Sequence, residues 1–257
     1  MVLRIAAIGR KLLLAALLAA PAPAAAIVGG APATGASASQ VVMVLAAGGG
    51  VCSGLVVARD TVLTAAHCIA GGRDIRVHFR DEAGTPVLME PAATAIHPGY
   101  NAQAISRRER SIDLGLVRTK TPLPSRFSPA TLGTANPRQG TSLVVTGWGL
   151  SNETNQDSMG TLLSARLEVI EPYGPGKILI WAADPHTKGK SAGAGVCHGD
   201  SGGPLLDASG TVIAISSWSK GANGSDCGLL TQGILTGPQR KFIDSTLTRW
   251  GRKAIWN

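Results

Sequence analysis

The sequence is poor in charged and aromatic residues and in cysteine, and each scarcity argues against a class of protein. Charged residues make up 16% of the 257 residues, aromatic residues make up 4%, and only four cysteines are present. No apolar run reaches the ~20 residues that a transmembrane helix needs. The absence of Lys/Arg runs and of basic-aromatic stripes argues against nucleic-acid binding. No two cysteines have Cys-x-x-Cys spacing, which argues against zinc-ribbon and thioredoxin-like sites.

Glycine, by contrast, is abundant, with 33 residues. Short apolar, β-branched segments alternate with glycine-rich breaks, a pattern that predicts strands joined by tight turns. We expect strands at 40–45, 51–58, 61–65, 75–79, 114–118, 142–146, 162–169, 177–181, 203–206 and 211–218.

These strands fall into two groups, separated by a proline-containing segment at 122–137 that predicts an extended linker. Apolar residues recur at helical spacing only near the end of the chain, which predicts a C-terminal helix within 238–257. The layout therefore predicts an all-β protein with one β-barrel at 27–121 and a second at 138–237.

The first 26 residues read as a cleaved secretory signal. Three basic residues precede a short apolar stretch at 12–20, which is followed by prolines and small residues up to Ala26. Cleavage after Ala26 leaves a chain that starts at Ile27, and cleavage after Ala24 leaves two alanines to be trimmed. We therefore expect a secreted protein, extracellular or periplasmic, without stable membrane association after cleavage. In that setting the four cysteines predict two disulfides.

Ser201 is the candidate nucleophile, because it stands between Asp200 and a pair of glycines in Gly-Asp-Ser-Gly-Gly-Pro. A serine hydroxyl needs a base to take its proton. The order of residues in α/β-hydrolases places the histidine after the serine, but no histidine follows Ser201 here. His67 lies beside Cys68 after an apolar strand, and Asp113 begins another apolar strand. These two residues are the candidate base and its orienting acid.

Five motifs occur in an order that resembles the trypsin/chymotrypsin family of serine endopeptidases. They are Ile-Val-Gly-Gly at 27–30, Thr-Ala-Ala-His-Cys at 64–68, Asp-Leu-Gly-Leu-Val at 113–117, Gly-Trp-Gly at 147–149 and Gly-Asp-Ser-Gly-Gly-Pro at 199–204. The resemblance covers essentially all of residues 27–257. It implies two six-stranded antiparallel β-barrels packed side by side, followed by the C-terminal helix.

The resemblance also implies the catalytic roles. His67 is the general base, Asp113 orients it, and Ser201 attacks the substrate to form an acyl-enzyme. The backbone N–H groups of Gly199 and Ser201 form the oxyanion hole. The implied disulfides are Cys52–Cys68 and Cys197–Cys227. No cofactor and no metal are expected.

The family pairs an aspartate at the position of Asp200 with a free N-terminal ammonium, which here is that of Ile27. No Lys or Arg precedes Ile27, so signal removal itself is expected to create this terminus. A buried ion pair that loses one member typically costs about 3–5 kcal/mol. Processing of the N-terminus is therefore expected to act as the switch.

The resemblance places the substrate pocket at Gly195, Val196, Ser217, Trp218, Ser219 and Gly233. The residues Gly195-Val196-Cys197 are similar to those of the neutrophil elastase group, and the predicted pocket contains no Asp or Glu. We expect a preference for small to medium apolar residues before the scissile bond. Partners are expected to be peptide or protein substrates and protein protease inhibitors, and the protein is expected to be a monomer. The alternative is a non-proteolytic binding or signalling protein on the same fold, which the complete set of catalytic residues disfavours.

Overall fold

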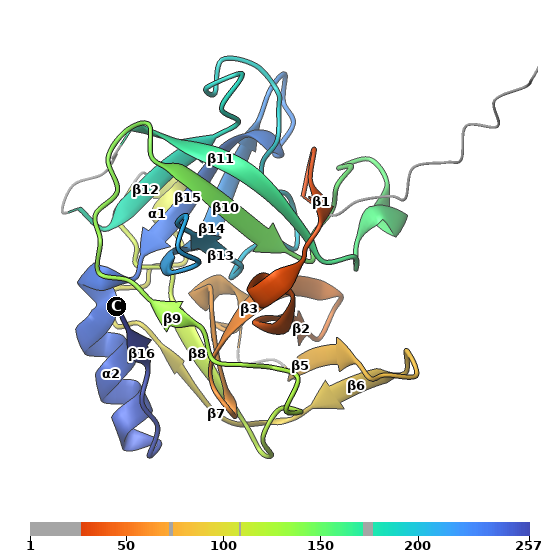
Figure 1. Cartoon of the computed structure of the whole chain (residues 1–257), viewed down its shortest axis with the longest axis vertical. Helices are drawn as coiled ribbons and strands as arrows, with labels where there is room; N and C mark the ends of the chain where they lie inside the picture. Colours follow the sequence, from red (N-terminus) through yellow and green to blue (C-terminus); the bar gives the residue numbers. More distant parts are fainter. Residues whose placement is uncertain (1–26, 72–73, 108, 172–176) are drawn as a thin grey trace, which may run out of the picture.

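The computed structural model describes residues 27–71, 74–107, 109–171 and 177–257 (Figure 1). The predicted signal segment 1–26 lies outside these residues. Figure 1 shows two β-sheet bodies packed against each other, with the C-terminal helix along one side. Short helical turns lie between strands at Gly35–Ser39, Ala66–Cys68, Ala104–Arg107 (α1) and Gln156–Ser158. No helix among the described residues is long and apolar enough to cross a membrane.

The first sheet closes into a barrel through a bent strand. Its antiparallel order is β6-β5-β2-β3-β4-β8-β7. The two edge strands β6 and β7 are separated in the chain only by Glu90, so together they join the two edges of the sheet. Counted this way, the barrel has the six strands that the sequence analysis predicts. The bounds are Val41–Ala46 (β2), Gly50–Ala58 (β3), Thr61–Thr64 (β4), Ile75–Arg80 (β5), Pro86–Met89 (β6), Pro91–Ile96 (β7) and Gly115–Thr119 (β8).

The second sheet contains a closed six-stranded ring, because β13 pairs with both β10 and β14. Three short strands outside the ring extend this sheet. β1 pairs with β11, and β9 lies parallel to both β14 and β16. The predicted linker 122–137 therefore contains a strand. The bounds are Ala31–Pro32 (β1), Thr131–Leu132 (β9), Ser142–Gly147 (β10), Leu163–Glu171 (β11), Leu179–Ala183 (β12), Pro204–Leu206 (β13), Val212–Gly221 (β14), Gly228–Leu235 (β15) and Ile255–Trp256 (β16).

A shared apolar cluster holds the two barrels and the helix together. It joins Leu55, Leu63 and Leu116 of the first barrel to Leu206, Val212 and Ile215 of the second and to Ile243 and Leu247 of the helix. These side chains are almost fully buried, and burial of one such side chain contributes about 1.5–3 kcal/mol. The two barrels are therefore held in a fixed position relative to each other.

The C-terminal helix α2 spans Arg240–Arg249 and is shorter than the predicted 238–257 segment. Gly251 has φ +69°, a conformation that glycine adopts without strain. The N–H of Gly251 donates to the carbonyl of Thr248, and the N–H of Arg252 donates to that of Leu247, which together make a Schellman ending. The chain then turns back and pairs as β16 with β9.

Candidate active site

A cleft of about 630 Å³ lies between the two barrels and gathers the candidate catalytic residues. The first barrel contributes His67 and Asp113, and the second contributes Ser201 and the strand Ser217–Ser219. These residues are far apart in the sequence and come from both barrels. The packing of the barrels therefore determines the geometry of the site.

His67 and Asp113 form the central contact of this cleft. His67 lies on the turn after β4, and its Nδ1 is 2.7 Å from Oδ2 of Asp113. The backbone N–H of His67 donates to Oδ1 of the same carboxylate at 2.8 Å, and the hydroxyl of Ser217 donates to Oδ2 at 2.6 Å. With Nδ1 protonated toward the carboxylate, Nε2 of His67 is the nitrogen that can accept a proton.

Asp113 remains ionised despite its position. Its side chain is 11% exposed, whereas that of His67 is 40% exposed. Burial alone would raise the pKa of Asp113, but the hydrogen bonds from His67 and Ser217 and the charge of the ring outweigh burial and lower it. The negative charge is therefore available to orient the ring and to stabilise an imidazolium.

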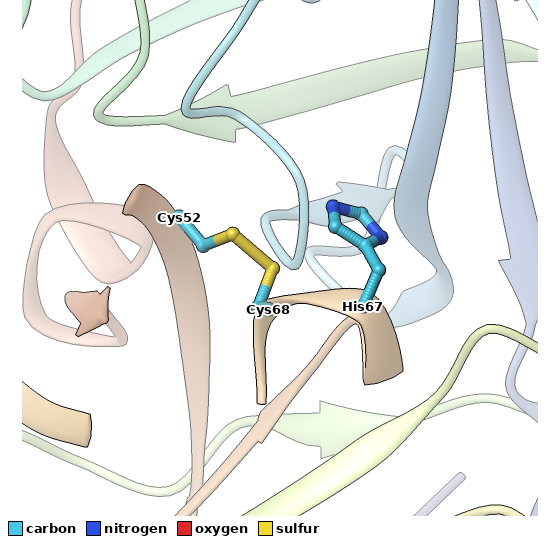
Figure 2. Close-up of side chains that lie close together, drawn as sticks. All are labelled: Cys52, His67 and Cys68. Atoms are coloured by element: carbon cyan, nitrogen blue, oxygen red, sulfur yellow. A yellow bond between two sulfur atoms is a disulfide. The ribbon is translucent and has the colours of Figure 1, made fainter. Parts of the chain in front are cut away.

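The Cys52–Cys68 disulfide fixes the turn that carries His67 (Figure 2). It links this turn to β3 across a sequence separation of 16 residues. In the chain-entropy view, closing such a loop contributes about 3 kcal/mol. The N–H of Ser53, the residue after Cys52, donates to the carbonyl of Ser201 at 2.8 Å. The disulfide and this hydrogen bond hold the turn of His67 and the backbone of Ser201 against the same strand.

Ser201 lines the same cleft. No hydrogen bond joins its hydroxyl to the His67 ring in the described part of the chain. Hydrogen bonds between a nucleophile and its base are often long in substrate-free active sites and tighten in the complex with substrate. The arrangement is therefore compatible with proton transfer from Ser201 to Nε2 of His67.

Two backbone N–H groups beside Ser201 are free to donate. Those of Gly199 and Ser201 have no acceptor among the described residues. The carbonyl of His198 accepts from Leu150 N at 2.8 Å, and the carbonyl of Asp200 accepts from Gly203 N at 3.0 Å. The N–H and C=O of a trans peptide point in opposite directions, so both free N–H groups point away from the donors of these two hydrogen bonds. Such a pair can stabilise an oxyanion.

Asp200 is fully buried and has no cation paired with it among the described residues. Its carboxylate accepts hydrogen bonds from the N–H groups of Gly149 at 2.8 Å and Cys197 at 2.9 Å. These bonds favour the charged form, but burial dominates and raises the pKa of Asp200 to about 7. This carboxylate therefore lacks a positive partner.

Ile27 lies in the same barrel as Asp200. Its side chain is fully buried in a core cluster that includes Val196. Val28 exchanges two backbone hydrogen bonds with Gly195, at 3.0 and 3.1 Å. Ile27 itself has φ +59°, which is strained for a β-branched residue. The segment around Ile27 is thus hydrogen-bonded to Gly195, a residue that lies five positions before Asp200 in the chain. The backbone of Ile27 is strained in this arrangement.

The predicted pocket residues divide into two sets. Ser217, Trp218 and Ser219 line the cleft, whereas Gly195, Val196 and Gly233 are buried and do not line it. The side chain of Val196 belongs to the barrel core, and Gly233 pairs with Ile180 and Ser216.

Thr231, which the sequence analysis missed, is the residue that pairs with Ser219 across the β14–β15 hairpin. It is fully buried, and its Oγ1 accepts a hydrogen bond from Val196 N at 3.2 Å. A bulge between Ser216 and Trp218 sets this register, and no signal in the sequence gives the position of that bulge.

Two clusters of potential metal ligands do not suit a metal ion. One joins His67 with Cys52 and Cys68 (Figure 2), and the other joins Glu153 and His198 with Cys227. All three cysteines are in disulfides, and a metal-binding cysteine must be a free thiolate. The cysteine of neither cluster can therefore serve as a metal ligand while its disulfide is intact.

Comparison with known proteins agrees with this geometry. Residues 27–233 match the family described as Trypsin. Kallikrein-8 of Homo sapiens is 31% identical over 187 residues, which cover 69% of this chain and 68% of the relative. Brachyurin of Leptuca pugilator is 27% identical over 179 residues, which cover 66% of this chain and 76% of the relative.

A solved structure is similar over most of the chain. Neuropsin, described as a serine protease expressed in the limbic system of mouse brain, superposes with a TM-score of 0.68 at 25% identity. The match covers 86% of this chain and 99% of neuropsin. The family match over residues 27–233 and these relatives show that the chain belongs to the trypsin family and is a serine endopeptidase.

Proposed function

We propose that this protein is a secreted serine endopeptidase that cleaves peptide bonds through an acyl-enzyme on Ser201. The observation that carries the proposal is the contact of His67 with Asp113 in the cleft that Ser201 also lines, at 2.7 Å between Nδ1 and Oδ2. The family supplies the reaction class, and the lining of one cleft by His67, Asp113 and Ser201 supports the roles of these residues.

The first half of the reaction acylates Ser201. Its Oγ attacks the carbonyl carbon of the scissile bond while Nε2 of His67 takes the hydroxyl proton. Asp113 holds the Nδ1–H and stabilises the imidazolium that forms. The N–H groups of Gly199 and Ser201 donate to the oxyanion, and one such donor is typically worth about 3 kcal/mol of the barrier. His67 then gives its proton to the leaving amine as the C–N bond breaks.

The second half releases the acid. A water molecule takes the place of the amine, and His67 accepts its proton while the water oxygen attacks the ester carbonyl of the acyl-enzyme. The tetrahedral intermediate collapses, the bond to Oγ breaks, and His67 returns the proton to Ser201. The enzyme is regenerated without a net change in protonation.

Removal of residues 1–26 is the proposed activation step. Cleavage before Ile27 frees an ammonium on a residue already buried in the barrel that contains Asp200. The φ angle of Ile27 depends on the preceding carbonyl carbon, so cleavage also releases the strain at φ +59°. The ammonium would supply the missing cation for Asp200. A secretory signal that ends in alanine would make export and activation one event.

For substrate preference we propose small to medium apolar residues before the scissile bond. None of the predicted pocket residues Gly195, Val196, Ser217–Ser219 and Gly233 is acidic, which supports an apolar rather than a basic residue at this position. The substrates are peptides or proteins, protein protease inhibitors are proposed as further ligands of the cleft, and the protein is proposed to act as a monomer.

The test is turnover by a chain that begins at Ile27. Peptide p-nitroanilides ending in Ala, Val, Leu, Phe or Arg should be hydrolysed, with the small apolar residues preferred. Ser201→Ala should abolish hydrolysis, while Ser245→Ala, which changes an exposed serine on α2, should not. Full activity in Ser201→Ala would refute the proposed nucleophile, and a preference for Arg would refute the proposed pocket.

A further inference from the structure

The charge of the cleft is opposite to that of the whole chain. The sequence has 24 Lys and Arg against 16 Asp and Glu. None of the described residues that line the cleft is Lys or Arg, whereas Glu109, Asp113 and Asp226 are carboxylates. Asp113 is occupied by His67 and Ser217, which leaves Glu109 and Asp226 facing the cavity from opposite barrels. A cleft lined by charges of one sign focuses its field on an incoming ligand.

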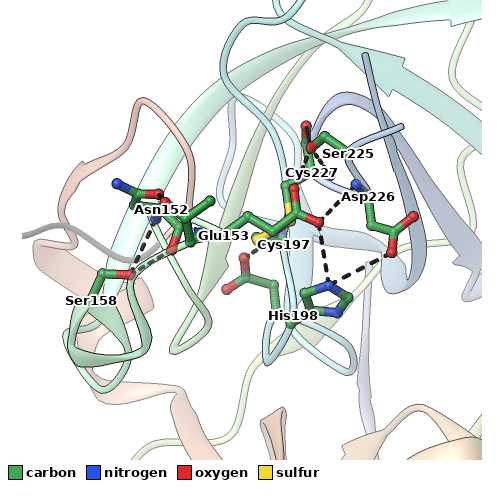
Figure 3. Close-up of polar contacts among 10 residues, drawn as sticks. Asn152, Glu153, Ser158, Cys197, His198, Ser225, Asp226 and Cys227 are labelled. Atoms are coloured by element: carbon green, nitrogen blue, oxygen red, sulfur yellow. Dashed lines mark hydrogen bonds and ion pairs between the residues drawn. A yellow bond between two sulfur atoms is a disulfide. The ribbon is translucent and has the colours of Figure 1, made fainter. Parts of the chain in front are cut away.

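Asp226 is the better placed of these two carboxylates. It lies in the turn between β14 and β15, next to Cys227, whose disulfide partner Cys197 precedes the oxyanion residue Gly199 by two positions (Figure 3). Its side chain is 62% exposed, and Nε2 of His198 lies 3.9 Å from its carboxylate oxygen Oδ2. Glu109, by contrast, accepts a hydrogen bond from Asn101 and follows closely on Arg107 in the chain.

Glu153 fixes the turn that carries Asp226. Its carboxylate accepts a hydrogen bond from the backbone N–H of Asp226 at 3.0 Å and another from the hydroxyl of Ser225 (Figure 3). Its Oε1 lies 3.8 Å from Nε2 of His198. Two carboxylates thus flank one exposed histidine at the rim, and Glu153 adds a second negative charge behind Asp226.

A peptide bound in the cleft would extend toward the side of the cleft that Asp226 and His198 line. β14 pairs with β13 only as far as Ile215, so within the described ranges the backbone of Ser217–Ser219 has an unpaired edge on the cleft side. A substrate strand can add to such an edge through main-chain hydrogen bonds. From Ser217, which contacts Asp113, the strand runs past Ser219 toward the turn with Asp226. Substrate residues paired beyond Ser217 therefore approach that carboxylate.

We propose that Asp226 is a specificity-determining residue. It selects substrates that carry Lys or Arg upstream of the cleaved bond, at a position N-terminal to the residue that enters the apolar pocket. This inference rests on the proposed function and refines its substrate class. The apolar pocket then chooses the residue before the bond, and the acidic rim chooses a cation further along the same peptide. Because the ion pair between Asp226 and the substrate cation is exposed, the expected preference for Lys or Arg over an uncharged residue is modest, about five-fold in kcat/KM.

The test uses fluorogenic tetrapeptides with one fixed apolar residue at the cleaved bond. Lys, norleucine or Glu is placed in turn at each of the three upstream positions. The chain from Ile27 should cleave the Lys peptide about five-fold faster than the norleucine peptide at one position or more, and high salt should reduce this ratio. Asp226→Asn should bring the ratio close to one, because kcat/KM should fall for the Lys peptides more than for the norleucine peptides.

The matched control is Asp157→Asn, which makes the same change in charge at an exposed residue outside the cleft and should keep the five-fold ratio. Equal cleavage of Lys and norleucine peptides by the unaltered enzyme overturns the inference, as does a ratio that survives Asp226→Asn. Failure of the proposed function looks different, because no peptide of any charge would then be hydrolysed.

Discussion

Ser217 donates its hydroxyl hydrogen bond to Asp113 across the boundary between the two barrels, over 2.6 Å. The same oxygen, Oδ2, accepts from Nδ1 of His67. The orientation of the His67 ring therefore depends on a residue of the second barrel as well as on its own. These two hydrogen bonds place the candidate catalytic groups at the interface between the barrels. Asp113 contacts the His67 ring directly, whereas Ser217 acts on the ring only through Asp113.

Replacement of Asp113 should be far more harmful than replacement of Ser217. Asp113→Asn presents an amide to His67, favours the wrong ring tautomer, and should lower kcat by about 10³–10⁴-fold. Ser217→Ala removes one hydrogen bond to a charged group and should cost roughly ten-fold. Steady-state kinetics on one peptide substrate measures both. Equal, small losses in the two variants would contradict the role of Asp113.

The buried carboxylate of Asp200 predicts how stability changes with pH in an unprocessed chain. Because burial raises its pKa to about 7 in the folded state, the folded protein holds a proton there that the unfolded chain has released above its ordinary pKa. Stability then falls as pH rises from about 4 to about 7, by up to about 4 kcal/mol. A chain that retains Ala26 should show this fall in urea unfolding.

The mature chain provides the comparison. With the ammonium of Ile27 available, Asp200 can ionise with a partner, so a chain that begins at Ile27 should lack most of this loss. Asp200→Asn should remove the same component from the chain that retains Ala26, because the side chain no longer titrates. Identical pH profiles for the two unaltered chains would refute the Ile27–Asp200 pair.

The two disulfides should differ in how much they stabilise the fold. Replacing Cys197 and Cys227 by serine opens a loop of sequence separation 30 and should cost about 4 kcal/mol of unfolding free energy. Replacing Cys52 and Cys68 should cost about 3 kcal/mol.

The first pair also joins the oxyanion segment to the turn with Asp226, so its loss should lower kcat/KM even where the protein remains folded. Denaturant titration and kinetics on the same samples separate the two effects. A Cys197/Cys227 variant with unchanged kcat/KM would contradict this positioning role.

Gly199 should tolerate no side chain. Its φ is +96°, and a Cβ there would lie 2.7 Å from Cα of Gly149, closer than real contacts allow. Gly199→Ala must therefore shift the backbone that carries the proposed oxyanion donor, and kcat should fall about 10²–10³-fold. The measurement is kcat in the variant, with circular dichroism as the control for folding. Near-normal kcat would contradict the assignment of Gly199 to the oxyanion hole.

Local sequence patterns predicted many of the strands, and the order of the motifs indicated which residues to consider for the candidate site. Apolar β-branched runs such as 51–58 and 114–118 carry a strong strand signal, and the structure has β3 and β8 there. The segment Pro91–Ile96 was missed because proline and alanine have low strand propensity. It is a strand because barrel closure gives it a partner, which is a tertiary effect.

The walls of the substrate pocket were the least predictable part. Strand β15 was missed because Gly228 and Gly233 interrupt its apolar pattern. Without that strand and the bulge opposite it, nothing in the text identifies Thr231 as the partner of Ser219. Local patterns predict elements and motifs, whereas register between strands depends on contacts that the sequence does not display.

The most direct test of the central claim is covalent labelling of the mature protein with a fluorophosphonate, followed by mass spectrometry of its peptides. Attack by an activated serine should give one adduct per chain, on Ser201, and labelling should be strongly slowed in His67→Ala. A protein that starts at Ile27, is folded, and yet remains unlabelled, or is labelled at another serine, would contradict the assignment of Ser201 as the nucleophile.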